Sequence, residues 1–179
     1  YTDAYPDIRK AFGEDDAAAL EHFVTFGMAE GRSGNAKFDV NSYRMRYGDL
    51  RSAFGDDLAA YYQHYMSYGK SEGRQGSGCS SLQGAATVYD GVDYAPVYDY
   101  QYYVDHNPDV KAAYGLNDGA VLEHFVRYGM AEGRTAKESF RAQAYRDRYG
   151  DLQQAFGNDW RAYYLHYLEH GLAEGRQGA

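Results

Sequence analysis

Cysteine and long apolar runs are scarce in this chain. One cysteine, Cys79, occurs among its 179 residues, so an internal disulfide is excluded, and no Cys/His spacing typical of a zinc site occurs. No apolar run approaches the roughly 18 to 20 residues that span a membrane. Acidic residues outnumber basic ones and give a formal net charge of −8. This charge argues against nucleic acid and against an anionic membrane surface, because both attract clustered Lys and Arg.

Motifs that carry catalysis or hold metal ions are also missing. The sequence has no nucleophile motif, phosphate-binding loop or dinucleotide fingerprint, and neither an EF-hand pattern nor a calcium-binding nonapeptide repeat. The acidic clusters at 14–16 and 56–57 are better explained as caps at helix N-termini. We therefore expect no enzyme activity, no cofactor and no metal site.

One stretch of the chain occurs four times, at 20–32, 62–74, 122–134 and 164–176. Each copy carries a His, an aromatic residue directly after it, a Gly five positions after the His, and a closing Glu-Gly-Arg. An offset of 102 residues maps the first half of the chain onto the second, and an offset of 42 maps the two units within each half. The pattern predicts an all-α protein of four stacked helical repeat units, A-B-A-B, in two pseudo-equivalent halves.

The first unit is expected to be truncated, because Tyr1 is the counterpart of Tyr103. We interpret the chain as an excised fragment. The predicted boundaries are a first repeat pair at 1–76, a joint at 77–97 and a second repeat pair at 98–179. The joint combines a Gly/Ser-rich loop with β-prone residues around Asp90-Gly91, which favours an irregular segment or a short hairpin.

Each unit is predicted to consist of two or three short helices. In the second unit one helical stripe is formed by four apolar side chains at i, i+4, i+7 and i+11, namely Tyr43, Tyr47, Leu50 and Phe54. The A units carry Pro6 or Pro108 at the position of Gly48, and proline favours the first position of a helix. The A units should therefore break there into two helices, whereas the B units should bend.

Glycines and short polar residues predict where the helices end and begin. The glycines expected to end the first part of each unit are Gly13, Gly55, Gly115 and Gly157. The residues expected to cap the following helix are Asp15, Asp56, Asn117 and Asn158. That helix is expected to stop in a Schellman-type turn at Gly27, Gly69, Gly129 or Gly171.

The four equivalent histidines, His22, His64, His124 and His166, have no His or Cys partner at ligand spacing that all units share. A structural role in packing, capping or hydrogen bonding is the better interpretation.

The B units differ from the A units by an extra apolar strip. Leu58 and Tyr61 in one B unit, and Trp160 and Tyr163 in the other, lie at i and i+3 on one helix face. Two interpretations are open: a contact with the neighbouring unit, or an exposed aromatic patch of the kind that supplies binding hot spots. A second candidate patch with the same two interpretations lies in the joint, at Tyr89, Tyr94 and Tyr98.

The chain resembles a Tyr-rich repeat of large secreted or wall-attached proteins of gut Gram-positive bacteria. The resemblance covers all four units and rests on motifs of the third unit at 102–110, 123–125 and 128–134. Such repeats occur beside cell-wall and carbohydrate-active modules. They are also associated with immunoglobulin-binding, superantigen-like proteins that hold antibody variable domains outside the antigen site. No binding residues are carried over, because the resemblance includes no binding motif.

The resemblance implies a secreted or cell-surface protein of a bacterium. Our first hypothesis is a non-enzymatic surface module that binds a host protein, the immunoglobulin Fab. The alternatives are a module that binds cell-wall polymer or another glycan, since aromatic platforms also serve sugars, and a passive stalk that holds other domains away from the surface.

Overall fold

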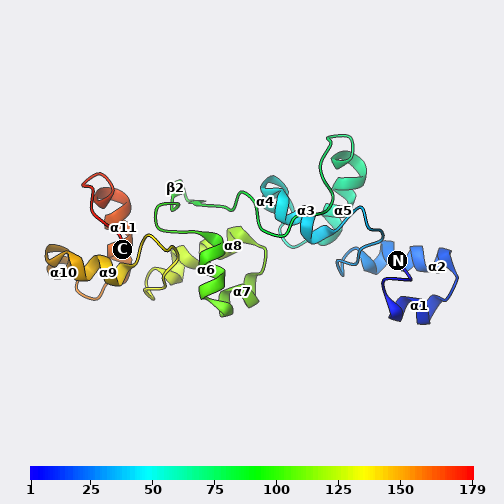
Figure 1. Cartoon of the computed structure of the whole chain (residues 1–179), viewed down its shortest axis with the longest axis horizontal. Helices are drawn as coiled ribbons and strands as arrows, with labels where there is room; N and C mark the ends of the chain where they lie inside the picture. The colour runs from blue at the N-terminus through cyan, green and yellow to red at the C-terminus, as the bar shows by residue number, and fades with distance from the viewer. The chain divides into compact units, whose positions relative to one another are not determined.

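The computed structural model describes all residues, 1–179, and is mostly helical (Figure 1). Eleven α-helices, four π-helical turns and one two-stranded sheet make up the regular structure. This confirms the helical class. Contacts divide the chain into two compact units, Tyr1–Gly84 and Ala85–Ala179, which we describe separately. No helix is long and apolar enough to cross a membrane.

The first unit holds two segments, 1–32 and 39–74. Helices and π-helical turns of segment 1–32 are α1 (Pro6–Phe12), α2 (Asp16–His22) and η1 (Phe23–Gly27). Those of segment 39–74 are α3 (Val40–Arg46), α4 (Gly48–Phe54), α5 (Leu58–His64) and η2 (Tyr65–Gly69).

The second unit begins with a hairpin and continues with segments 99–134 and 141–176. The hairpin pairs β1 (Val88–Tyr89) with β2 (Val92–Asp93) across a turn in which Asp90 and Gly91 both have positive φ. Segment 99–134 contains α6 (Tyr100–His106), α7 (Pro108–Tyr114), α8 (Asp118–His124) and η3 (Phe125–Gly129). Segment 141–176 contains α9 (Ala142–Arg148), α10 (Gly150–Phe156), α11 (Trp160–His166) and η4 (Tyr167–Gly171).

The helix expected to bend at Gly48 is in fact two helices. Tyr47 separates α3 from α4 with an extended backbone, φ −114° and ψ 99°. This conformation places its ring 4.9 Å from that of Tyr43, and its hydroxyl accepts a hydrogen bond from the Gln75 backbone N–H at 2.8 Å. Tyr149 does the same between α9 and α10. Contacts of a tyrosine therefore break the helix without a proline.

Four predicted helix ends are confirmed, and two predicted starts are wrong by one residue. Gly13, Gly55, Gly115 and Gly157 end α1, α4, α7 and α10 with positive φ. Asp15 and Asn117 cap α2 and α8 as expected. In the B segments Asp57 and Asp159 are the caps, in place of Asp56 and Asn158. Asp56 instead pairs with the Arg44 guanidinium.

The Schellman-type ends expected at Gly27 and its counterparts are absent. There α2, α5, α8 and α11 widen into the π-helical turns, and the following residue is still helical; Met28, for example, has φ −64° and ψ −45°. The glycines with positive φ lie four residues later, in the Glu-Gly-Arg motifs: Gly31, Gly73, Gly133 and Gly175.

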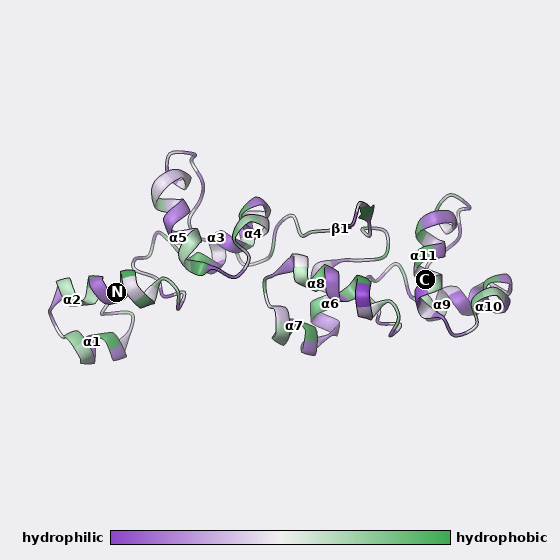
Figure 2. Ribbon diagram, turned by 180° about the vertical axis from the view of Figure 1, so that it is seen from behind, coloured by the Kyte–Doolittle hydropathy of each residue, from purple (hydrophilic) through white to green (hydrophobic).

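Tyrosine supplies much of the core. Fully buried tyrosines, with at most 1% exposure, are Tyr43, Tyr61, Tyr98, Tyr103, Tyr145, Tyr163 and Tyr164. Several of their hydroxyls donate to backbone carbonyls, as Tyr61 does to Gly55 at 2.8 Å and Tyr163 to Gly157 at 2.8 Å. A phenol can be buried at little cost when its hydroxyl is satisfied in this way. Because the apolar residues are spread over short helices, hydrophobic and hydrophilic residues alternate within single ribbons in Figure 2.

Candidate functional site

A tyrosine–histidine hydrogen bond recurs in all four segments. The tyrosine hydroxyl meets histidine Nδ1 at the end of the α-helix that precedes each π-helical turn. The pairs are Tyr1–His22 at 2.9 Å, Tyr43–His64 at 3.0 Å, Tyr103–His124 at 3.0 Å and Tyr145–His166 at 3.1 Å. This bond agrees with the structural role expected for the histidines.

The glycine five residues after each histidine makes room for that tyrosine. A Cβ added to Gly27 would lie 2.7 Å from the Tyr1 hydroxyl oxygen, and one added to Gly69, Gly129 or Gly171 would overlap the corresponding hydroxyl more closely. None of these four glycines has a positive φ. Close approach, and not backbone conformation, is the reason for glycine at these positions.

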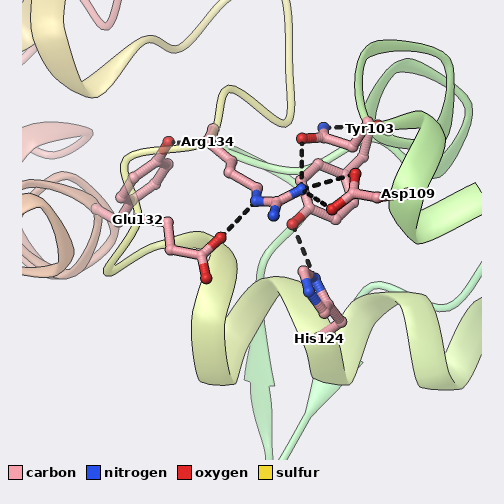
Figure 3. A network of polar contacts seen from close by, with 7 residues as sticks. Tyr103, Asp109, His124, Glu132 and Arg134 are labelled. Carbon is pink, nitrogen blue, oxygen red and sulfur yellow. Dashed lines mark hydrogen bonds and ion pairs between the residues drawn. The ribbon is translucent and has the colours of Figure 1, made fainter. Parts of the chain in front are cut away.

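A cluster of one Arg, one Asp and one Glu, joined by ion pairs, lies beside each tyrosine, and we call this cluster the bracket. In segment 99–134, Arg134 contacts the Asp109 carboxylate at 2.8 Å and Glu132 at 2.5 Å, and it donates to the Asn107 side-chain oxygen at 3.1 Å (Figure 3). The same Arg–Asp–Glu set occurs in the other segments as Arg32–Asp7–Glu30, Arg74–Asp49–Glu72 and Arg176–Asp151–Glu174. The hydrogen bond from the arginine lowers the pKa of Asp7, Asp49, Asp109 and Asp151.

A second aromatic residue covers the arginine in three of the segments. The guanidinium carbon lies 5.0 Å from the ring centre of Tyr5 for Arg32, 4.8 Å from Tyr47 for Arg74 and 4.7 Å from Tyr149 for Arg176. Segment 99–134 has Asn107 at this position. The arginine after the last turn of each segment is therefore linked to the helix that carries the aspartate. A cation–π contact adds to this link in three segments, and a hydrogen bond to the Asn107 amide does so in the fourth.

Burial favours the neutral forms of Tyr43, Tyr145, His124 and His166. Burial raises the pKa of Tyr43 and of Tyr145 to about 12. Burial, followed by the charge of Arg134 or Arg176, lowers the pKa of His124 and His166. A hydrogen bond between a neutral phenol and a neutral imidazole is a structural contact that no charge disturbs.

Each histidine ring also lies near two further ring side chains, and we call each such set of three an aromatic row. The ring-centre distances are 5.5 and 5.6 Å in Phe12–His22–Phe26, 5.8 and 5.8 Å in Phe54–His64–Tyr68, 5.7 and 5.6 Å in Tyr114–His124–Tyr128, and 5.7 and 5.5 Å in Phe156–His166–His170. The outer aromatic side chain is 56% exposed at Phe26, 61% at Tyr68 and 54% at Tyr128. A groove lined by Ala18, Glu21 and Thr25 runs beside the first row. An exposed aromatic side chain therefore recurs at the same position of three segments.

The apolar strip of the B segments is a packing surface and not an exposed patch. Tyr61 and Tyr163 are completely buried. Leu58 and Trp160 are half-buried, because each covers the glycine of the preceding Glu-Gly-Arg motif, at Gly31 and Gly133. The expectation of an exposed strip is therefore wrong for the two tyrosines, which contact Phe54 and Phe156 of their own segments. Contact with the preceding segment is found for Leu58 and Trp160.

The tyrosines of the joint are also largely packed. Tyr94 and Tyr98 are buried, with 5% and 1% exposure, so the exposed patch expected there is wrong for both. Tyr89 is half-buried, and its hydroxyl accepts a hydrogen bond from Arg127 Nε at 3.1 Å. Binding roles for Leu58, Trp160 and Tyr89 stay predictions.

The sequence analysis missed the outer residues of the aromatic rows. They stand at the fourth position after each histidine, directly before the close-approach glycine. That i, i+4 spacing from a partly buried histidine was the available signal.

No group of three or more His, Cys, Asp or Glu side chains is placed to hold a metal ion. Cys79 is half-buried, and its thiol lies 3.1 Å from the Ser81 carbonyl oxygen. Comparison with family models, curated proteins and solved structures gives no match.

Proposed function

We propose that the four segments are repeat units of an A-B-A-B array, and that the array is a non-enzymatic bacterial surface module. Its proposed ligand is a host protein, the variable part of the immunoglobulin Fab. The resemblance to superantigen-like surface proteins supports the choice of ligand. The observation that carries the choice of surface is the exposed outer aromatic residue of the rows at Phe26, Tyr68 and Tyr128.

The rows have the properties of a preformed binding surface. Each histidine is hydrogen-bonded to a tyrosine, as His64 is to Tyr43 at 3.0 Å, so the outer ring lies beside an imidazole that is held in place. Rigid aromatic side chains bind at a low cost in conformational entropy. Tyrosine is enriched among the few residues that carry most of the binding energy at protein interfaces. A standard interface of about 800 Å² per partner would cover at least one row and its surroundings.

The test is biolayer interferometry of the full chain against polyclonal immunoglobulin, with Fab and Fc measured separately. We expect binding to Fab and not to Fc. Tyr68→Ala and Tyr128→Ala should each weaken it by more than about 1 kcal/mol, because an exposed ring can be truncated without loss of core packing. Leu172→Ala is the matched control, since Leu172 is also exposed but lies outside the rows.

Three other outcomes would change the proposal. If the affinity for Fab is unchanged in both tyrosine variants but falls in Trp160→Ala, the binding site is the apolar strip that contains Trp160 and not the aromatic rows. Absence of binding to Fab would overturn the immunoglobulin assignment, and a pull-down on purified cell walls would then test the glycan alternative. If the chain binds neither Fab nor cell walls, the stalk hypothesis is the one that stands.

A further inference from the structure

The aromatic row of segment 141–176 differs from the other three rows at its outer position. Four residues after the central histidine, each of the other segments carries Phe or Tyr, whereas segment 141–176 carries His170. His166 and His170 are therefore a histidine pair at i and i+4, across the junction of α11 and η4. This is the spacing at which two histidines on one face of a helix bind the same metal ion.

The two imidazoles lie at a distance that suits a shared ion. Their ring centres are 5.5 Å apart, and the ring planes are inclined by 59°. Two imidazoles that share one ion, each at a metal–nitrogen distance of about 2.0–2.1 Å, have ring centres about 5 Å apart. The His170 side chain is 62% exposed and is free to make the small rotation that brings both rings to one ion. The backbone of η4 does not have to move.

The tyrosine–histidine bond prepares His166 as a ligand. Its Nδ1 is hydrogen-bonded to the Tyr145 hydroxyl at 3.1 Å, and its second ring nitrogen, Nε2, is neither hydrogen-bonded within the chain nor buried. An imidazole that carries its proton on Nδ1 donates it to the phenol and keeps the lone pair of Nε2 for a metal ion. Histidine ligands in proteins are oriented in this way, by a hydrogen bond at the ring nitrogen that does not bind the metal.

The charges around the pair favour a cation. The Glu169 carboxylate lies 3.9 Å from His170 Nε2 and is 67% exposed. The guanidinium of Arg176, whose charge acts on His166, is already paired with the carboxylates of Asp151 and Glu174 at 2.8 and 2.5 Å. These three carboxylates outnumber the one guanidinium, and their field attracts a positive ion.

We propose that His166 and His170 form a two-nitrogen site for a divalent late transition-metal ion, with water in the remaining coordination positions. Imidazole suits Cu²⁺, Ni²⁺ and Zn²⁺, whereas Mg²⁺ and Ca²⁺ prefer oxygen ligands. Two protein ligands are fewer than the three or four of catalytic and structural zinc sites, so the ion exchanges with solvent and does not hold the fold together. The proposal revises the expectation of no metal site, which considered ligand spacings that all units share. It does not depend on immunoglobulin binding.

The experiment adds Ni²⁺ to the full chain and measures its affinity by isothermal titration calorimetry. We expect one saturable site. NMR spectra of the six histidine side chains identify the ligands, because the paramagnetic ion should broaden the imidazole signals of His166 and His170 first. Mg²⁺ at the same concentration should not displace Ni²⁺, since it binds oxygen and not imidazole.

Three variants provide matched controls. His170→Tyr gives this row the outer residue that Tyr68 provides in its own row, and it should weaken Ni²⁺ binding at least tenfold, because a chelating pair becomes a single ligand. Tyr68→His creates a second pair with His64, whose ring centre lies 5.8 Å from that of Tyr68, and should raise the stoichiometry from one ion to two. His106→Gln removes an exposed histidine that has no histidine four residues away, and it should leave the affinity unchanged.

Ni²⁺ affinity that is unchanged in His170→Tyr, equal broadening of all six histidines, displacement by Mg²⁺, or no saturable binding would each overturn the proposal. A single site in Tyr68→His would also overturn it, because it would show that the spacing within a row does not hold an ion. Fab binding is measured separately, so failure of either proposal can be distinguished from failure of the other.

Discussion

Segments 1–32 and 99–134 share their residue pattern but differ in what covers them. Both contain the tyrosine–histidine bond, at 2.9 Å for Tyr1–His22 and 3.0 Å for Tyr103–His124. Both also have the Arg–Asp–Glu bracket. Leu122 is nevertheless buried, in a segment against which Tyr94 and Tyr98 pack, whereas its counterpart Leu20 is exposed. The comparison shows that a repeat sequence determines its internal contacts, while the burial of its outer apolar face depends on a neighbouring segment.

The sharpest way to break this comparison is to truncate the matched leucines. We expect Leu122→Ala to cost about 2–5 kcal/mol of unfolding free energy, because it leaves a cavity at a buried position. Leu20→Ala should change stability by less than about 0.5 kcal/mol, because its side chain is already in water. Urea denaturation of both variants measures the difference. Equal losses would show that the face of segment 1–32 is covered in solution.

The close-approach glycines give the next largest effect. Gly129→Ala should cost about 1–3 kcal/mol, because the added methyl group overlaps the Tyr103 hydroxyl in a packed core. Gly27→Ala should cost less, since Tyr1 is half-buried, belongs to no helix and can move aside. Thermal unfolding of the two variants tests this order. A neutral Gly129→Ala would contradict the close-approach explanation.

Two buried tyrosines of the second unit should respond in opposite directions to loss of the hydroxyl. Tyr103→Phe removes the hydroxyl that is hydrogen-bonded to His124 Nδ1 and should cost about 1 kcal/mol. Tyr98, which lies just before α6, is buried, and its hydroxyl has no hydrogen-bond partner. Tyr98→Phe should therefore be neutral or slightly stabilising. The urea denaturation midpoints of the two variants, measured side by side, test this difference. A clear loss of stability in Tyr98→Phe would show that the Tyr98 hydroxyl has a hydrogen-bond partner.

Acidification should produce the smallest effect, in the second unit. The pKa values of His124 and His166 are lowered by burial in the folded state from the ordinary value of 6.5. As the pH falls below 6.5, these histidines bind protons more readily in the unfolded chain than in the folded one. The free energy of unfolding is therefore highest at pH 7 and decreases as the pH falls from 6.5 through the lower pKa values of the folded state. NMR titration of the two imidazoles should give midpoints below 6.5. Midpoints above that value would reverse the predicted pH dependence.

Local chemistry made much of the helix layout predictable. Pro108 and Gly115 bound α7 as their backbone preferences require, and Asn117 caps α8. The break at Tyr47 was missed because it depends on contacts with Tyr43 and Gln75, which no local propensity contains. The cap at Asp57 was missed because two adjacent aspartates satisfy the same rule, and the neighbouring Arg44 decides between them.

The candidate surface was less predictable, for a related reason. Trp160 and Tyr163 have the composition of a hot spot, but Trp160 covers Gly133 of the preceding segment and Tyr163 is completely buried. Sequence periodicity identifies an apolar face and not its occupant. Tyr68 and Tyr128 are exposed although the rings of His64 and His124 beside them are partly buried, and the helical period alone does not show this difference.

A hydroxyl joins the two segments of each half. Tyr62 donates to the Arg32 carbonyl at 2.8 Å, and Tyr164 donates to the Arg134 carbonyl at 2.7 Å. Each bond therefore couples the arginine that closes one bracket to the helix of the next segment. In the proposed array of repeat units, this bond is an interaction between nearest neighbours within each half. Cooperative melting should then extend over a pair of segments, so that the chain loses its structure in blocks of two.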